Sequence, residues 1–363
     1  MSSGGGVGHG GSLAPRAVLV HRTTEYEELL ARHGTHGQAE FFLSSRGRSI
    51  REVAERHHRT RRALGEVAAA VPLRWRQTRV ERADLDRFLF APEDVVVVVG
   101  QDGLVANTAK YLAGQPVVGI DTEPGRNPGV LVRHRVADTA RLLRAAVARG
   151  GGTADELTMV EAVADDTQRL VALNEIYVGR PGHQTSRYRL GLDLSDGQGP
   201  AGPGGSARSA RSARLGGPAR SARPGGSARS GAPVPAGRSG QDFGSAEAAD
   251  RAEAQASSGV LVGTGTGATG WLRSLWRERG GAQPLPAPAD PRLVWYVREA
   301  WPSPATGTSL VEGTLTSAQR LRLTVESDRL VAFGDGIESD ALELTWGQTV
   351  RLGVSDTSLR LLV

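Results

Sequence analysis

The first 150 residues alternate short apolar runs with longer stretches in which apolar side chains recur every three or four positions. Five consecutive valines at 95–99 predict a central strand that is covered on both faces. Residues 49–70 have apolar side chains at helical spacing and predict an amphipathic helix. The other expected elements are strands at 17–20, 73–80 and 116–120, and helices at 24–32, 82–89, 104–112 and 136–149. This alternation predicts a doubly wound, parallel α/β domain over residues 16–150.

After three glycines at 150–152 the pattern changes to short β-type runs separated by Pro, Gly and Asp clusters. Such runs predict a C-terminal antiparallel β domain over residues 153–363. Its expected strands lie at 157–161, 169–178, 187–194, 293–297, 310–314, 321–325, 329–333, 342–345, 350–354 and 359–363. Ser-Ala-Arg triplets with Gly and Pro fill residues 196–257, which we expect to be a disordered insertion. The Gly/Ser-rich residues 1–15 predict a disordered tail.

Composition and charge exclude several classes of protein. The 363 residues include 44 Lys+Arg and 39 Asp+Glu, for a net charge of +5. Seven arginines, no acid and no aromatic residue lie between Ala201 and Gly240, so this segment favours a solvated linker over a nucleic-acid interface. The absence of cysteine excludes disulfide scaffolds, Cys-ligated zinc and thiol nucleophiles. With no membrane-length apolar run and no secretory signal, we expect a cytoplasmic protein without a membrane partner.

The first candidate site is Gly100-Gln101-Asp102-Gly103, directly after the valine strand and before a predicted helix. Ligands of open α/β sheets bind at such strand ends. Glycine allows backbone N–H groups to approach phosphate oxygens, and a helix N-terminus favours anions. Asp102 is then a general base or a Mg²⁺ ligand, whereas the plainer interpretation is a βα turn with a helix-capping Asp.

Two more candidates lie in the β domain. Asn174-Glu175 is an unusual pair for the middle of a strand, and one ligand can contact both side chains only if the strand ends or bulges there. Residues 258–271 form a short apolar strand, a Gly/Thr loop and the start of a helix. The loop offers backbone donors and hydroxyls to a phosphate or a ribose, and it lacks the lysine of a P-loop.

Together these segments resemble the NAD kinase family. Its motifs are a G-G-D-G-T loop, an Asn-Glu pair after an apolar strand, and a T-P-T-G-S-T-A-Y loop before a helix. The counterparts here are residues 100–104, 174–175 and 264–271, in the same order. Residues 119–126 are similar to the family's G-I-N-T-G segment. The mitochondrial-type branch of the family is the most similar in motif. It has an N-T-D-P form of that segment and a Gly-Thr-Gly-Thr-Gly loop ending near a Trp.

The resemblance implies a two-domain kinase of the NAD kinase type, with an α/β domain followed by an antiparallel β domain. It implies transfer of the γ-phosphoryl group of ATP, or of polyphosphate, to the adenosine-ribose 2′-hydroxyl of NAD. Asp102 would be the general base, and Gly100 and Gly103 would hold phosphates, whose charge Mg²⁺ bound with ATP would neutralise. Asn174 and Glu175 would contact NAD. The same cleft would be lined by Thr264, Thr266, Gly267, Thr269, Gly270 and Trp271. The family also implies a homo-oligomer. We expect no metal site formed by the protein itself.

The chain departs from the family motifs at several positions. Gln101 replaces the second glycine of the loop, Leu104 replaces its threonine, and Asp121 replaces the asparagine of N-T-G. Because of these changes, a catalytically weakened NAD(P)-binding regulator is an alternative function. A diacylglycerol- or sphingosine-type lipid kinase, which shares the G-G-D-G loop, is the other alternative. The adjacent His57 and His58 are expected to be surface residues, because neighbouring helical side chains diverge by about 100°.

Overall fold

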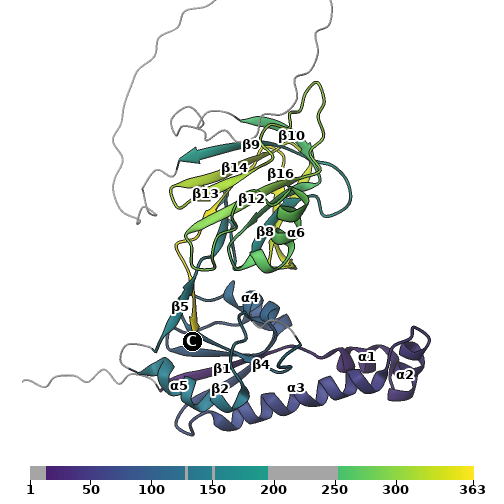
Figure 1. The fold of residues 1–363 in the computed structure, drawn as a ribbon, viewed down its shortest axis with the longest axis vertical. Helices are drawn as coiled ribbons and strands as arrows, with labels where there is room; N and C mark the ends of the chain where they lie inside the picture. The colour runs from purple at the N-terminus through teal and green to yellow at the C-terminus, as the bar shows by residue number, and fades with distance from the viewer. Residues whose placement is uncertain (1–13, 127–129, 149–151, 195–251) are drawn as a thin grey trace, which may run out of the picture.

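A computed structural model of the protein describes residues 14–126, 130–148, 152–194 and 252–363. It contains an α/β domain with a mixed, mainly parallel sheet, and a β domain with two antiparallel sheets, which confirms the two fold classes expected for the two parts of the chain (Figure 1). Most of the expected tail and insertion lies outside the described residues. Of the helices in the described ranges, none combines the length and apolar composition that crossing a bilayer requires.

The first sheet has the strand order β2-β1-β3-β4-β18-β5. Its first four strands are parallel, β18 is parallel to β4, and β5 is antiparallel to β18. The strands are β1 (Arg16–His21), β2 (Arg76–Glu81), β3 (Asp94–Gly100), β4 (Pro116–Asp121), β5 (Ala154–Leu157) and β18 (Leu359–Leu362). The helical elements are α1 (Glu25–His33), α2 (His36–Ser44), α3 (Ile50–Ala70), η1 (Arg82–Arg87), α4 (Asp102–Ala109), η2 (Val136–Asp138) and α5 (Thr139–Val147).

Alternate residues of β1 and β3 point to opposite faces of this sheet, and both faces are buried. Val18 and Val20 enter a core with apolar residues of α4, whereas Ala17 and Leu19 enter a core with α3 and α5. The chain leaves β1 toward β2 on one side and leaves β3 toward β4 on the other. The topological switch point, where open α/β sheets bind ligands, therefore lies between β1 and β3.

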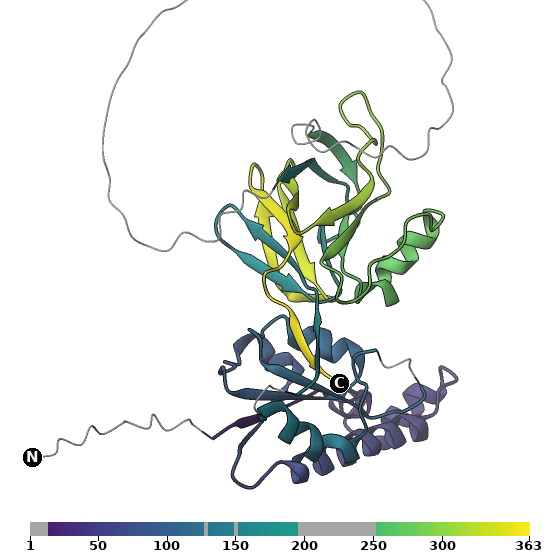
Figure 2. The same cartoon turned by 60° about the vertical axis from the view of Figure 1, so that its left-hand side comes forward.

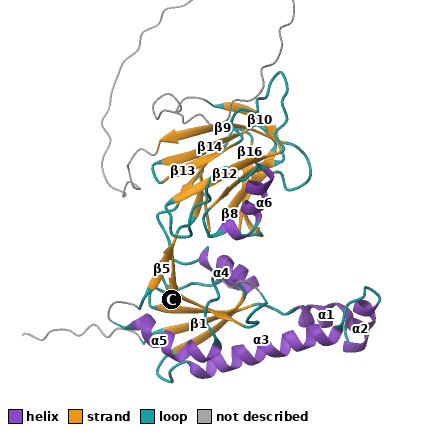
Figure 3. Cartoon of the chain, in the orientation of Figure 1, coloured by secondary structure: helices purple, strands orange, loops and turns teal. Residues whose placement is uncertain are grey.

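The β domain is a sandwich. One sheet has the order β10-β9-β14-β17-β6-β7 and the other β13-β12-β11-β8-β15-β16, and their inner faces share one apolar core. The helix α6 (Trp271–Glu278) packs against β8, β11 and β12 (Figure 3). The strands are β6 (Val160–Ala164), β7 (Arg169–Ala172), β8 (Glu175–Gly179), β9 (Ser186–Leu194), β10 (Glu253–Ser257), β11 (Gly259–Gly263), β12 (Arg292–Arg298), β13 (Glu312–Thr316), β14 (Gln319–Val325), β15 (Arg329–Gly334), β16 (Ile337–Thr345) and β17 (Thr349–Val354).

Several elements differ from the expectations. The run expected at 359–363 is β18, which pairs with β4 in the α/β domain, and β5 pairs with β18 there. Both ends of the expected β domain therefore belong to the α/β sheet. The single strand expected at 169–178 is two strands in different sheets. The last residues of the expected insertion form β10, with Gln255 fully buried. Residues 82–89 contain a 3₁₀ turn rather than an α-helix, and α2 was not expected. Hydrophobic period identifies a strand but not its partner, which explains the first two differences.

The two domains are stacked end to end (Figure 2). Hydrogen bonds join α4 and the residue after it to the β15–β16 hairpin. The Asn107 amide Nδ2 donates to the Asp335 carbonyl at 2.9 Å. Lys110, the only lysine of the chain and almost fully buried, donates to Asp340 at 2.8 Å, and the Tyr111 hydroxyl donates to the same carboxylate at 2.6 Å. Since α4 also begins at the Gly100–Gly103 loop, this interface connects the loop directly to the β domain.

Candidate functional site

The Gly100–Gly103 loop lies at the carboxyl end of β3, and Asp102 is the first residue of α4. The Asp102 carboxylate accepts three backbone hydrogen bonds, from Val130 N at 2.8 Å and from Leu131 N and Val132 N at 2.9 Å each. The chain at 131–132 passes so close over β4 that a Cβ on Gly119 would lie 2.2 Å from the Leu131 carbonyl. One acceptor position on Oδ2 remains, because a carboxylate has about four lone-pair sites. Asp102 therefore both anchors this segment and keeps room for one more donor.

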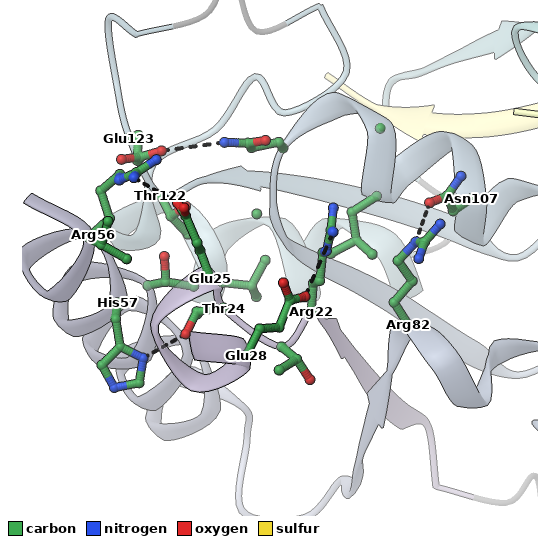
Figure 4. Close-up of a pocket in the computed structure, with 18 of the residues that line it drawn as sticks. Arg22, Thr24, Glu25, Glu28, Arg56, His57, Arg82, Asn107, Thr122 and Glu123 are labelled. Carbon is green, nitrogen blue, oxygen red and sulfur yellow. Dashed lines mark hydrogen bonds and ion pairs between the residues drawn. The ribbon is translucent and has the colours of Figure 1, made fainter. Parts of the chain in front are cut away.

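A cavity of about 600 Å³ opens at the topological switch point. Its walls include Arg22, Thr23 and Thr24 after β1, Gly100 and Gly103 after β3, and Thr122 after β4, with α1 and α3 on one side (Figure 4). Asp335 of the β domain completes the lining. The structure thus places the two predicted loop glycines on a cavity of nucleotide-binding size, at the end of the sheet where such ligands bind.

The cavity wall contains charges of both signs. Arg56 pairs with Glu25 at 2.9 Å, and Arg22 lies 3.9 Å from Glu28. Arg82 instead donates from Nε to the Asn107 amide oxygen at 2.7 Å. Figure 4 marks each of these three contacts with a dashed line. The arginines therefore differ in how far neighbouring carboxylates neutralise them.

Two residues that depart from the family motifs, Gln101 and Asp121, both contact Glu123, which lines the cavity. Gln101 Nε2 lies 3.3 Å from the Glu123 carboxylate, which also pairs with Arg59 at 3.4 Å and Arg126 at 3.2 Å. Asp121 accepts a hydrogen bond from the Glu123 backbone N–H at 2.8 Å. An aspartate thus stabilises this turn through the kind of side-chain contact that an asparagine can also make.

His57 lies on the cavity wall, contrary to the expectation that it is a plain surface residue, whereas His58 is exposed. Its Nδ1 is 2.8 Å from the hydroxyl of Thr24, which also caps α1 through a capping box with Glu27. Burial lowers the pKa of His57. The helical spacing placed the two histidines on different faces, but only the packing of α1 on α3 shows which of them meets the cavity.

Asn174 lies between β7 and β8, where the chain passes from one sheet of the sandwich to the other. The strand therefore breaks at the Asn-Glu pair, as simultaneous contact with one ligand requires. The carboxylate of Asp335 accepts backbone hydrogen bonds here, from Leu173 N at 2.8 Å and Asn174 N at 2.7 Å, with Glu175 N at 3.4 Å. The break is thus stabilised by a side chain 161 residues away.

Two carboxyl groups lie close together at this break. Burial raises the pKa of Asp335 to about 6, against the opposing effect of its backbone hydrogen bonds. Burial, and secondarily the neighbouring Asp335, raises the pKa of Glu175 to about 7. Among the described residues the Glu175 carboxylate has no hydrogen-bond or ion-pair partner, although its Oε2 would lie 3.0 Å from a Cβ on Gly267. A half-buried acid without a partner among the described residues marks a candidate ligand contact.

The Gly/Thr loop packs directly on the Asn-Glu break. Thr264 N–H donates to the Asn174 carbonyl at 2.9 Å, and the Thr264 hydroxyl donates to the Leu173 carbonyl at 2.6 Å. Gly267 is required here, because a Cβ would lie 2.4 Å from the Asn174 carbonyl oxygen. The hydroxyl of Thr266 is buried and, within the described chain, has no hydrogen-bond partner. The structure therefore brings Asn174, Glu175 and the first part of this loop together.

The end of the loop packs against β8. Trp271 begins α6, stacks on Tyr177 at 5.4 Å between ring centroids and lies under the Arg298 guanidinium. Thr269 and Gly270 are exposed. Of the predicted site residues, only Gly100 and Gly103 are among the described residues that line the 600 Å³ cavity; Asp102, the Asn174-Glu175 pair and the Gly/Thr loop are not. Their expected contact with NAD stays a prediction.

Asp335 is the functional candidate that the sequence analysis missed. It lines the cavity beside Gly100 and Gly103, and its carboxylate also positions Asn174 and Glu175, so it links the two groups of predicted residues. The Asp335-Gly336 dipeptide is typical of a hairpin turn, and it is the one signal for this position in the sequence. In the structure both residues have positive φ. Among the described residues, no group of three His, Asp or Glu side chains is placed to hold a metal ion.

No family model matches the chain. A search of curated proteins finds NAD kinase 2, mitochondrial, from Rattus norvegicus, which is 27% identical over 138 residues. The match covers 36% of this chain and 32% of the rat protein. The Mus musculus protein of the same name is also 27% identical over 138 residues, covering 36% of this chain and 30% of the mouse protein. The matched stretch thus spans about a third of the length of these relatives.

Proposed function

We propose that this protein is an ATP-dependent phosphotransferase of the NAD kinase type, which converts NAD to NADP. The distant similarity to two NAD kinases supports a kinase that uses NAD and ATP. The observation that carries the proposal is the position of Asp335. It lines the cavity that contains the Gly100–Gly103 loop, and it holds the Asn174-Glu175 break of the other domain. A donor site and an acceptor site thus share one residue.

In the proposed reaction, the donor's phosphates lie at the loop after β3. Backbone N–H groups at the start of α4 and the helix dipole favour anions there. ATP enters together with its Mg²⁺, which reduces the negative charge of the phosphates. These interactions orient the γ-phosphoryl group toward the acceptor.

Asp102 is the proposed general base. The adenosine-ribose 2′-hydroxyl of NAD would donate its proton to the remaining acceptor position on Oδ2. Its oxygen then forms a bond to the γ-phosphorus, while the bond from that phosphorus to the bridging oxygen of ADP breaks. The three backbone N–H bonds hold the carboxylate at a fixed angle, so that base and acceptor are aligned before reaction.

Asn174, Glu175, Thr264 and Thr266 are the proposed acceptor contacts. Glu175 and the buried Thr266 hydroxyl have no partner among the described residues, so a ribose hydroxyl or amide of NAD would satisfy them. We retain Gly267, Thr269, Gly270 and Trp271 as proposed parts of this cleft. We also propose that the protein is a homo-oligomer and is located in the cytoplasm.

The test is a substrate panel with γ-labelled ATP and purified protein, offering NAD, NADH, diacylglycerol and sphingosine in separate reactions. Label in NADP, lost in Asp102→Asn, supports the proposal, and label in a lipid replaces it with the lipid-kinase alternative. Replacing ATP by polyphosphate identifies the donor.

The NAD(P)-binding regulator is kept as second candidate because Gln101 is tied to Glu123 and Asp102 already accepts three hydrogen bonds. NAD binding without ADP release on addition of ATP would establish it.

A further inference from the structure

Arg82 lies in the cavity wall and reaches toward the domain interface (Figure 4). It is the first residue of η1, directly after β2, and it is partly buried. Its Nε donates to the Asn107 amide oxygen at 2.7 Å, and the Asn107 Nδ2 donates to the Asp335 carbonyl at 2.9 Å. Because both ends of the Asn107 amide are engaged, the amide has a fixed orientation and holds the guanidinium in place.

Arg82 differs from the other arginines of the cavity wall in its charge partners. The cavity is lined by two other arginines, of which Arg56 pairs with Glu25 at 2.9 Å and Arg22 lies 3.9 Å from Glu28. Arg82 has no carboxylate ion-pair partner among the described residues. A guanidinium has five N–H donors, and its single bond to Asn107 leaves four for a ligand. The planar fork of such a group matches the oxygens of a phosphate.

A second feature of the same cavity also favours an anion. Gly103 lines it at the first turn of α4, where N–H groups lack partners within the helix. Asn107, to which Arg82 is bonded, follows Gly103 by about one turn of α4, and all three residues line the cavity. Arg82 and the helix start are therefore two positive features of the same wall. A chain of linked phosphate groups is a ligand that can bind to both the guanidinium and the helix start.

We propose that Arg82 binds the phosphates of the phosphoryl donor. The inference deepens the proposed function, on which it rests for the assignment of a donor and an acceptor. In this arrangement the guanidinium contacts the phosphate chain, and its bond to Asn107 anchors it beside Asp335, the residue that positions the acceptor segment.

Isothermal titration with Mg·ATP, with inorganic tripolyphosphate and with NAD tests the proposal on the full chain. Arg82→Gln is expected to raise the Kd for Mg·ATP and tripolyphosphate about ten- to a hundred-fold, as for loss of a hydrogen bond to a charged group. The Kd for NAD should change less than twofold, and Arg82→Lys should lie between wild type and Arg82→Gln. The matched control is Arg87→Gln in the same 3₁₀ turn, whose side chain is 82% exposed. An unchanged Kd for Mg·ATP in Arg82→Gln, or an equal loss for NAD, would overturn the assignment.

A measurement on the wild-type protein keeps the test valid if Arg82→Gln does not fold. Phenylglyoxal modifies accessible guanidinium groups, and peptide mass spectrometry reports the extent at each arginine. Tripolyphosphate should protect Arg82 and leave Arg87 equally reactive, whereas equal modification of Arg82 with and without tripolyphosphate contradicts the proposal. Because these experiments measure donor binding alone, absence of NADP formation would refute the proposed function without refuting the role of Arg82.

Discussion

The carboxylate of Asp335 accepts a hydrogen bond from the backbone N–H of Asn174 at 2.7 Å, although the two residues are 161 positions apart. One is in a hairpin turn with φ 53°, and the other is at the point where the chain leaves one sheet for the other. The bond therefore fixes the backbone of the proposed acceptor segment from outside that segment.

Asp335→Ala should lower the free energy of unfolding by about 2–4 kcal/mol, because it leaves the backbone N–H groups of Leu173 and Asn174 without their acceptor. Urea denaturation at pH 7 measures the change. Asp328→Ala is the control, since the Asp328 side chain is 96% exposed. Equal stability of the two variants would show that water or another group replaces the carboxylate at no cost.

Asp102→Asn should reduce phosphoryl transfer to NAD by about 10²–10⁴-fold, as expected for loss of a general base. The structure adds a second effect. An amide cannot accept from Val130 N on one side and from Leu131 N and Val132 N on the other, so stability should fall by about 1–2 kcal/mol. Initial rates and thermal melting separate the two effects, and near-normal turnover in a destabilised variant would make Asp102 purely structural.

Stability should depend on pH through Glu175. Burial raises its pKa from 4.5 to about 7 in the folded protein, so between these values the folded state keeps a proton that the unfolded chain releases. The contribution of Glu175 to the free energy of unfolding should therefore be greatest below pH 4.5. It should fall by about 3 kcal/mol as the pH rises to about 7. Glu175→Gln should flatten this part of the profile and be more stable than wild type at pH 8.

Denaturant midpoints at several pH values, with Glu278→Gln on the exposed end of α6 as control, test this prediction. A profile of Glu175→Gln that runs parallel to wild type would contradict it. If Glu175 also contacts NAD, the same substitution should raise the KM for NAD more than that for ATP.

Replacing residues 197–250 by a short Gly/Ser loop should leave the melting temperature and turnover nearly unchanged. Loop length affects closure entropy only logarithmically, and β9 and β10 are already paired from Leu190 and Glu253 onward. Extending the replacement to 256 should destabilise the protein strongly, because it removes most of β10 with the fully buried Gln255. Thermal melts of both variants decide the point, and equal stability would show that β10 contributes little.

Two glycine-to-alanine substitutions should have opposite effects. At Gly267 a Cβ would lie 2.4 Å from the Asn174 carbonyl, and the resulting shift should cost about 1–3 kcal/mol. At Gly65, within α3, a Cβ meets no atom within 4 Å, so alanine should stabilise the helix by about 1 kcal/mol. Chemical denaturation of each variant measures both signs, and a neutral Gly267→Ala would mean that the loop moves away from Asn174 easily.

Much of the local structure follows from the sequence, because it depends on neighbouring residues. The valine run is a buried strand in the structure, 49–70 contains the long helix α3, and the Gly100–Gly103 loop joins β3 to α4. Helix α2 was missed because only Ala39 and Leu43 of its nine residues are buried, too few to show a helical period. The boundary of β10 was missed because its composition continues that of the residues before it.

The sequence by itself determined the kinds of element and the groups available for chemistry, whereas only the tertiary structure decided which of them meet. An apolar run such as 359–363 is equally suited to either sheet, and its pairing with β4 depends on residues some 240 positions earlier. The contacts of Asp335 with Asn174, and of Arg82 with Asn107, likewise join segments whose separation no local pattern records. Burial of Glu175 beside Asp335 raises its pKa for the same reason, since desolvation depends on everything packed around a group and not on its neighbours in the chain.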